Sequence, residues 1–116
     1  MGTSVRDREA TIAQLEAEVM RFQRARHWER FHNPKDLAMS VAIEAAELME
    51  HFQWGDHQSA EEYLGDAAQK GEVADEMADV LIYLMVLAAH CEIDLAEALR
   101  SKMARNETRF PPEAYS

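Results

Sequence analysis

The feature that most constrains this chain is a segment in which carboxylates lie next to a strongly apolar surface. Residues 72–90, EVADEMADVLIYLMVLAAH, consist largely of strong helix formers. Within this segment Glu76 and Asp79 are three residues apart, so they share one stripe of the expected helix. A helix this apolar is expected to be central in the fold, and its carboxylates are then at least partly buried. Buried carboxylates need a partner or a metal ion.

A second segment repeats the pattern. Residues 44–54, EAAELMEHFQW, are also composed mainly of helix formers. From Ser40 onwards, polar and aromatic side chains recur every three or four residues and line one stripe, namely Ser40, Glu44, Glu47, His51 and Trp54. Two glutamates stacked one helical turn apart repel each other, so this stripe also requires an explanation.

A shared metal site explains both stripes. If the two helices pack antiparallel, Glu44, Glu47, Glu76 and Asp79 converge, and four carboxylates cannot all stay ionised without a cation. Hard oxygen ligands favour Mg²⁺, with Mn²⁺ as a substitute, over zinc. A di-iron bundle would use Glu-x-x-His pairs, whereas His51 follows Glu47 by four residues. A single acidic pair is more often a solvated helix face; two pairs beside apolar surfaces favour metal binding.

Composition restricts the class of protein. The chain has 116 residues and a formal net charge of −10, so we expect one domain, 1–116, that binds neither nucleic acid nor anionic membranes. Cys91 is the single cysteine, which excludes an internal disulfide. We expect no secretory signal, and the longest apolar run, Val80 to Ala89, is too short to span a bilayer. The expected location is the cytoplasm.

The helix-forming segments and the cap signals between them predict an all-α fold of four main helices. Three of the expected helix beginnings have sequence signals. Ser4 and Asp7 resemble an S-x-x-D cap, Asn33 precedes Pro34 as an N-cap, and Asp94 is the third cap. A capping box at Ser59 predicts a short extra helix, and the rest of the stretch from Gly55 to Gly71 is expected to be a mobile loop. The expected main helices are Val5 to Arg30, Pro34 to Phe52, Glu72 to His90 and Leu95 to Arg109, and the short helix is Ala60 to Ala68.

Taken together, the motifs resemble a known family. A 28-residue gap separates Glu44-x-x-Glu47 from Glu76-x-x-Asp79. The chain also carries WERFHNP at 28–34, FQW at 52–54, DVLIYL at 79–84 and KMARNETRFP at 102–111. This order is similar to the MazG-like all-α nucleoside triphosphate pyrophosphohydrolases, and most similar to their dCTP pyrophosphatase branch. The segment 55–71 matches no family sequence, which leaves substrate choice by that loop open.

The resemblance implies an activity and a set of residues. It implies Mg²⁺-dependent cleavage of a nucleoside triphosphate to a monophosphate and diphosphate, with dCTP-like or modified deoxynucleotides as substrates, in pool sanitation. It also implies a four-helix bundle completed as a homodimer or homotetramer, with sites at subunit interfaces. Metal binding and catalysis are implied for Glu44, Glu47, Glu76 and Asp79. Substrate binding is implied for Trp28, His32, Trp54, Tyr83, Lys102, Asn106 and Arg109.

The residues themselves add chemical detail. Lys102, Asn106 and Arg109 are spaced i, i+4 and i+7, which places an ammonium, an amide and a guanidinium on one helix face, suited to phosphate oxygens. Glu47 is our choice for a carboxylate that also orients the attacking water. Without the motifs, the favoured interpretation of Lys102 and Arg109 is that they complement the helix dipole, and the aromatic residues could be ordinary packing residues.

Two other functions remain open from the sequence. A non-catalytic helical module that oligomerises or binds nucleotide would use the acidic stripes for solubility or contacts. A phosphoribosyl-ATP pyrophosphatase is a weaker alternative, because the two tryptophans suit a wall around a base. His51 and the His90–Cys91 pair are interpreted as structural or incidental.

Overall fold

The computed structural model describes residues 6–115, and within that range it is helical without strands. The predicted all-α class and the predicted number of helices, four main and one short, are confirmed. The α-helices are α1 (Ile12–Ala25), α2 (Pro34–Glu50), α3 (His57–Leu64), α4 (Ala67–His90) and α5 (Leu95–Arg109), and the short 3₁₀ helices are η1 (Trp28–Phe31) and η2 (Pro112–Tyr115).

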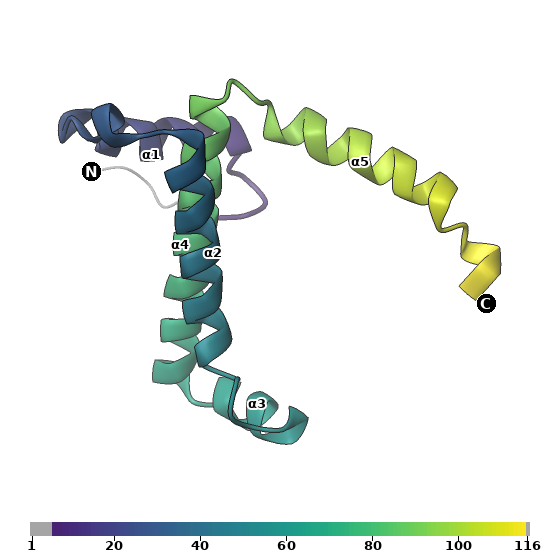
Figure 1. Ribbon diagram of the computed structural model, residues 1–116. Helices are drawn as coiled ribbons and strands as arrows, with labels where there is room; N and C mark the ends of the chain where they lie inside the picture. The colour runs from purple at the N-terminus through teal and green to yellow at the C-terminus, as the bar shows by residue number, and fades with distance from the viewer. Residues whose placement is uncertain (1–5, 116) are drawn as a thin grey trace.

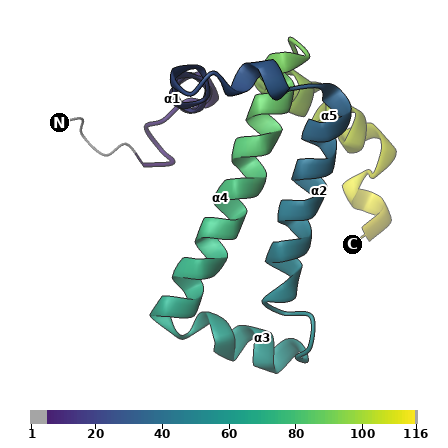
Figure 2. The same ribbon diagram turned by 60° about the vertical axis from the view of Figure 1, so that its left-hand side comes forward.

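The centre of the fold is the antiparallel pair formed by α2 and α4, which lie side by side along most of their length (Figure 2). Helix α3 joins their far ends, and α1 with η1 covers the other end (Figure 1). The small buried core comes mainly from this pair, with Leu37 from α2 and Val73, Met85, Val86 and Ala88 from α4. Four of these five residues lie on α4, so this apolar helix is central in the fold, as its sequence predicted.

Helices α2 and α5 begin at the capping residues that the sequence predicted. Asn33 caps α2, because its Oδ1 accepts from the backbone N–H of Asp36 at 2.9 Å, and Pro34 occupies the first helical position. Asp94 caps α5 in the same way through the N–H of Glu97 at 2.9 Å. Helix α2 ends within two residues of the predicted end at Phe52, and a turn leads to Gly55.

The predicted first helix was wrong at both ends. It begins at Ile12, because Thr11 and Gln14 form a reciprocal capping box with distances of 3.1 and 2.9 Å. Of the predicted start, Ser4 and Val5 lie outside the described residues. The helix ends at Ala25 instead of Arg30, because His27 adopts a left-handed conformation with φ of 55°. This break turns the Trp28 segment into a 3₁₀ helix.

The stretch 55–71 is more helical than predicted. Helix α3 begins at His57, because Asp56, rather than Ser59, supplies the cap and accepts from the N–H of Ser59 at 2.8 Å. Helix α4 begins at Ala67 instead of Glu72, with Asp66 as its cap. Gly71 therefore lies inside α4 rather than in a loop. No mobile loop of the predicted length exists between α2 and α4 in the described chain.

Helix α5 differs from the others because it projects away from the α2–α4 pair (Figure 1). The exposed apolar side chains of the described residues include a stripe on α4, formed by Met77, Leu81 and Leu84, and Met39 and Ile43 on α2. On α5, Leu99 and Met103 are also exposed, at 61% and 49%. None of the helices described in residues 6–115 is long and apolar enough to cross a membrane.

Candidate metal centre and nucleotide-binding cavity

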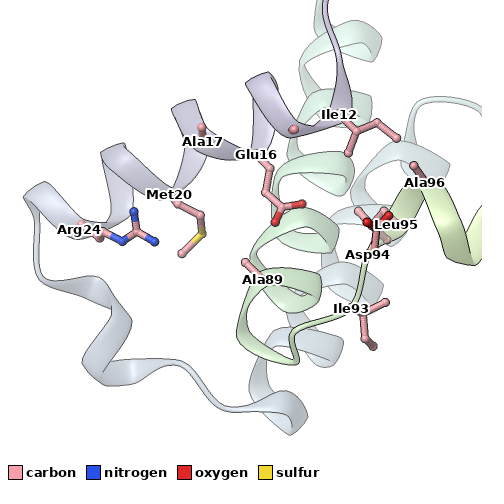
Figure 3. A pocket seen from close by; sticks show the side chains of 11 residues that line it. Ile12, Glu16, Ala17, Met20, Arg24, Ala89, Ile93, Asp94, Leu95 and Ala96 are labelled. Atoms are coloured by element: carbon pink, nitrogen blue, oxygen red, sulfur yellow. The ribbon is translucent and has the colours of Figure 1, made fainter.

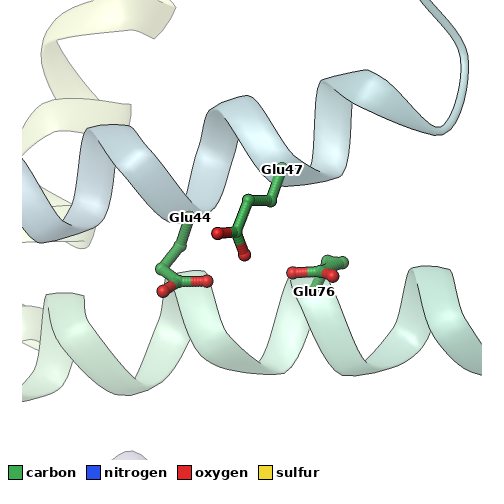
Figure 4. Close-up of side chains that lie close together, drawn as sticks. All are labelled: Glu44, Glu47 and Glu76. Carbon is green, nitrogen blue, oxygen red and sulfur yellow. The ribbon is translucent and has the colours of Figure 1, made fainter.

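The two central helices bring three of the predicted acidic residues together. Glu44 and Glu47 extend from α2 towards α4, where Glu76 meets them (Figure 4). One carboxylate oxygen from each lies within 4.8 Å of the other two. The spacing of three residues on α2 and the antiparallel packing of α4 produce this convergence.

The local electrostatics disfavour three free carboxylates. Burial is the main cause that raises the pKa of Glu44 above its ordinary value of 4.5, followed by a hydrogen bond and repulsion from Glu47. Burial likewise raises the pKa of Glu76, with repulsion from Glu47 and Asp79 adding to it and nearby His51 opposing it. Each unpaired negative charge therefore makes the next one harder to ionise.

The cluster has the properties of a cation site. Oε2 of Glu44 and Oε2 of Glu76 are both buried without a hydrogen-bond partner. Among the described residues, no lysine or arginine forms an ion pair with any of the three glutamates. Buried carboxylate oxygens that lack donors are satisfied by a metal ion, and an all-oxygen ligand set suits Mg²⁺ or Mn²⁺. The residues present therefore fit a hard divalent cation.

Asp79 lies beside this cluster rather than within the three-oxygen group. The Asp79 carboxylate repels the charges of the cluster, and this repulsion contributes to the raised pKa of both Glu44 and Glu76. It also lines a cavity of about 470 Å³ with Trp28 and Tyr83. Asp79 thus connects the acidic cluster to an aromatic cavity.

The aromatic cavity unites three predicted substrate-binding residues. Trp28, His32 and Tyr83 line a hollow of about 250 Å³ that shares Trp28 and Tyr83 with the larger one. Phe22 fixes the Trp28 ring in an edge-to-face contact with ring centres 5.6 Å apart. A flat aromatic wall beside an acidic cluster is a suitable surface for a base next to a phosphate chain.

Gln23 is a cavity residue that the sequence analysis missed. It is 6% exposed and lines both hollows, and its Oε1 lies 3.1 Å from Nε2 of His32. Burial, followed by repulsion from His90, lowers the pKa of His32, which favours the neutral ring with N–H directed at Gln23. Gln23 adjoins Phe22 on the apolar stripe of α1, and this neighbourhood was the available sequence signal.

The remaining predicted residues are not assembled with the cluster in one chain. Trp54 is 87% exposed in the turn after α2. Lys102, Asn106 and Arg109 lie on the projecting helix α5, away from the α2–α4 pair (Figure 1). The Arg109 guanidinium stays close to its neighbour, 5.0 Å from the ring centre of Phe110.

A further hollow lies where α1 passes the turn between α4 and α5 (Figure 3). Its volume is about 440 Å³, and its lining includes Met20, Ala89 and Ile93 together with the charged residues Glu16, Arg24 and Asp94. None of its lining residues is among the predicted site residues.

Comparison with known proteins gives this geometry a family context. The family model described as "MazG-like family" matches residues 39–114, which carry the whole acidic cluster and α5. The chain belongs to the MazG-like family. The resemblance inferred from the motifs is confirmed. The matched range also includes 55–71, so the expectation that this segment matches no family sequence was wrong.

The individual relatives agree with the family match. The dCTP pyrophosphatase 1 proteins of Mus musculus and Homo sapiens are each 39% identical over 100 residues, which is 86% of this chain and 57% of theirs. This chain therefore spans little more than half the length of those relatives. A crystal structure of a pyrophosphatase from Archaeoglobus fulgidus has a TM-score of 0.81 and 39% identity, covering 93% of this chain and 99% of that one.

Proposed function

We propose that this chain is a divalent-metal-dependent nucleoside triphosphate pyrophosphohydrolase. It converts a nucleoside triphosphate and water to the monophosphate and diphosphate. Deoxycytidine triphosphate and related or modified deoxynucleotides are the proposed substrates, because relatives of this chain carry the name dCTP pyrophosphatase. The proposal makes the domain a housekeeping enzyme of the nucleotide pool.

One observation carries the proposal: the Glu44, Glu47 and Glu76 oxygens lie within 4.8 Å of one another, and two of these residues have buried, unpartnered oxygens. The aromatic hollow lined by Trp28 and Tyr83 adjoins the cluster through Asp79. A nucleoside triphosphate needs cations beside its phosphates and a flat apolar wall beside its base; the acidic cluster would hold the cation, and the hollow supplies the wall.

Each part of the site has a proposed task. A bound Mg²⁺ or Mn²⁺ would supply Lewis acidity, activation of water and stabilisation of the diphosphate leaving group. Glu44, Glu76 and Asp79 would hold the cation, and Glu47 would both contribute an oxygen to it and orient the attacking water. The Trp28 ring stacks on the base, and Gln23, fixed by His32, offers its amide N–H groups to acceptors on the base edge.

The cationic helix requires a second copy of the chain. Lys102, Asn106 and Arg109 suit phosphate oxygens, but α5 projects away from its own acidic cluster (Figure 1). The exposed apolar stripes of α2, α4 and α5 support association, because a monomer seldom exposes such surfaces without a partner. We propose a homodimer, or a pair of dimers, in which α5 reaches the site of another subunit. Light scattering coupled to size-exclusion chromatography measures the assembly, and a monomer at working concentrations would contradict this part.

The activity is tested with a substrate panel. The purified protein is incubated with Mg²⁺ and canonical or modified deoxynucleoside triphosphates, alone or in competition with phosphoribosyl-ATP, and both products are quantified. The expected products are monophosphate and diphosphate in equal amounts, dependent on the metal, with deoxycytidine compounds turned over fastest. Absence of turnover, or release of orthophosphate, would overturn the proposal. Preference for phosphoribosyl-ATP would support the alternative reaction within the same fold.

A further inference from the structure

His51 lies between the acidic cluster and the short helix α3. It follows α2 directly and its side chain is 15% exposed. On one side its Nδ1 is 2.8 Å from the hydroxyl of Tyr63, a residue of α3. On the other side its Nε2 is 3.9 Å from Oε1 of Glu76. A single ring thus joins α3 to one of the cluster glutamates on α4.

The chemistry of the two partners orients the ring. A glutamate carboxylate only accepts hydrogen bonds, so the favourable tautomer carries its hydrogen on Nε2, facing Glu76. Nδ1 then has a lone pair and accepts from the Tyr63 hydroxyl, which can donate. Both contacts are satisfied by the same neutral tautomer. The 3.9 Å separation exceeds a hydrogen bond, but Glu has three rotatable bonds with which to close it.

The two oxygens of Glu76 have different surroundings. Oε1 is the atom near His51, whereas Oε2 is buried without a hydrogen-bond partner. If His51 fixes Oε1, the other oxygen is left for a cation. Metal-ligating carboxylates are commonly held in this way by outer hydrogen bonds.

Aromatic packing holds His51 in place. The Tyr63 ring lies edge-on to Phe52 with centres 5.8 Å apart, and it is 5.7 Å from the His51 ring. These contacts tie the turn after α2 to α3. The ring is therefore supported from the side opposite Glu76, as a group that orients a ligand must be.

We propose that His51, clamped by Tyr63, is a positioning residue that orients Glu76 for metal binding. The inference rests on the proposed metal-dependent function. It gives α3 a role in the site: its Tyr63 sets the tautomer and direction of the ring. His51 acts through Glu76 and is not assigned any contact with substrate.

Two substitutions separate the two sides of the ring. In His51→Gln the longer amide reaches the position of Nε2 and can still donate to Glu76. In His51→Asn the shorter amide reaches only the position of Nδ1, so the contact with Tyr63 remains and the donor to Glu76 is lost. Tyr63→Phe removes only the hydroxyl. His57→Asn, at an exposed histidine of α3, is the matched control.

The primary measurement is Mn²⁺ binding without nucleotide, from the electron paramagnetic resonance signal of free Mn²⁺. We expect His51→Asn to weaken binding about 10-fold or more, the usual effect of losing an outer-sphere partner. We expect His51→Gln to stay within about threefold of wild type, and Tyr63→Phe to fall between the two. In turnover assays, the Mg²⁺ concentration for half-maximal rate should rise in His51→Asn, with the nucleotide KM at saturating Mg²⁺ unchanged.

The outcomes are distinguishable. If His51→Gln and His51→Asn both bind Mn²⁺ like wild type, His51 does not position Glu76. If His51→Gln loses affinity and His51→Asn retains it, the ring acts only by packing on Tyr63, and the inference is also overturned. If His51→Asn does not fold, unchanged Mn²⁺ binding in Tyr63→Phe would still contradict the clamp. Failure of the wild type to bind Mn²⁺ would instead overturn the proposed metal-dependent function, and this inference with it.

Discussion

The α2–α4 pair and helix α5 carry opposite charges and have opposite environments. The pair packs its glutamates together and leaves Glu44 and Glu76 with buried oxygens that lack partners. Helix α5 carries Lys102 and Arg109 and projects away from the other helices (Figure 1). One chain therefore brings the acidic cluster together by itself, whereas under the proposed assembly the phosphate contacts come from another copy. Changes in the two regions should therefore have separable effects.

The largest effect is expected at the packed region. Glu47→Gln keeps the shape of the side chain but removes its charge and its ability to accept a proton. We expect kcat to fall roughly 10²–10⁴-fold, the range for losing a general base, with weaker Mn²⁺ binding in addition. Diphosphate release measures the rate. Glu50→Gln, at an exposed position of the same helix, is the control and should retain activity. Full activity of Glu47→Gln would remove this residue from the site.

A smaller and different effect is expected on the projecting helix. In Lys102→Ala we expect kcat/KM for the triphosphate to fall about 10–100-fold, because a hydrogen bond to a charged group contributes about 1.5–3 kcal/mol. Mn²⁺ affinity without nucleotide should be unchanged, since α5 lies apart from the acidic cluster. Arg105→Ala is the control, because Arg105 donates to Ser101 at 2.7 Å on its own helix. Loss of Mn²⁺ affinity in Lys102→Ala would contradict the division between the two regions.

The metal-free packed region should also show an unusual pH dependence. Unfolded glutamates lose their protons near 4.5, whereas the raised pKa values of Glu44 and Glu76 keep these residues protonated to higher pH in the fold. The folded state then binds more protons, so its free energy of unfolding falls as pH rises above 4.5 and levels off beyond the raised pKa values.

Urea unfolding in the presence of a chelator, at several pH values, measures this slope. Adding Mn²⁺ at about 100 times its Kd should restore about 2.7 kcal/mol at neutral pH. In Glu44→Gln the slope should be shallower. A stability that rises with pH between 4.5 and neutrality would show that the cluster is not strained by its own charge.

The smallest expected effect is a change in the free energy of unfolding from a glycine substitution in α4. Gly71 lies inside this helix, and a Cβ there would meet nothing within 4 Å. Gly71→Ala should therefore stabilise the fold by about 0.5–1 kcal/mol without changing Mn²⁺ affinity. At Gly55 a Cβ would come within 3.0 Å of Cβ of Ser59, so Gly55→Ala should give no such gain. Thermal unfolding of the two variants makes the comparison, and equal gains would contradict it.

Much of the site could be predicted because it depends on helix periodicity. The i, i+3 spacing of Glu44 and Glu47 fixes their common direction on α2, and an antiparallel partner was the one further assumption needed to add Glu76. Asp79 was placed in the same group by spacing alone. Its side chain is one methylene shorter than that of Glu, so in the fold it lies beside the three-oxygen group and also lines the aromatic cavity.

The errors arose where local signals compete. Gly71 is a helix breaker by propensity, but burial of Val73 and the strong Asp66 cap extend α4 through it. The first helix begins later than predicted because the Thr11–Gln14 capping box, which was not considered as a start signal, fixes its first turn. The position of Gln23 beside Phe22 was too weak a signal by itself, because the roles of Gln23 and Tyr63 come from partners 9 and 12 residues away, across turns that sequence patterns do not determine.

The projection of α5 has a genetic consequence. If each site combines the glutamates of one subunit with the α5 of another, a chain disabled at Glu47 still donates an intact α5. A chain disabled at Lys102 still donates an intact acidic cluster. Mixed dimers of the two inactive proteins would then contain one fully functional site, and random mixing would restore about a quarter of the wild-type activity. Two harmful alleles could thus complement each other, whereas two alleles that both damage the α2–α4 pair could not.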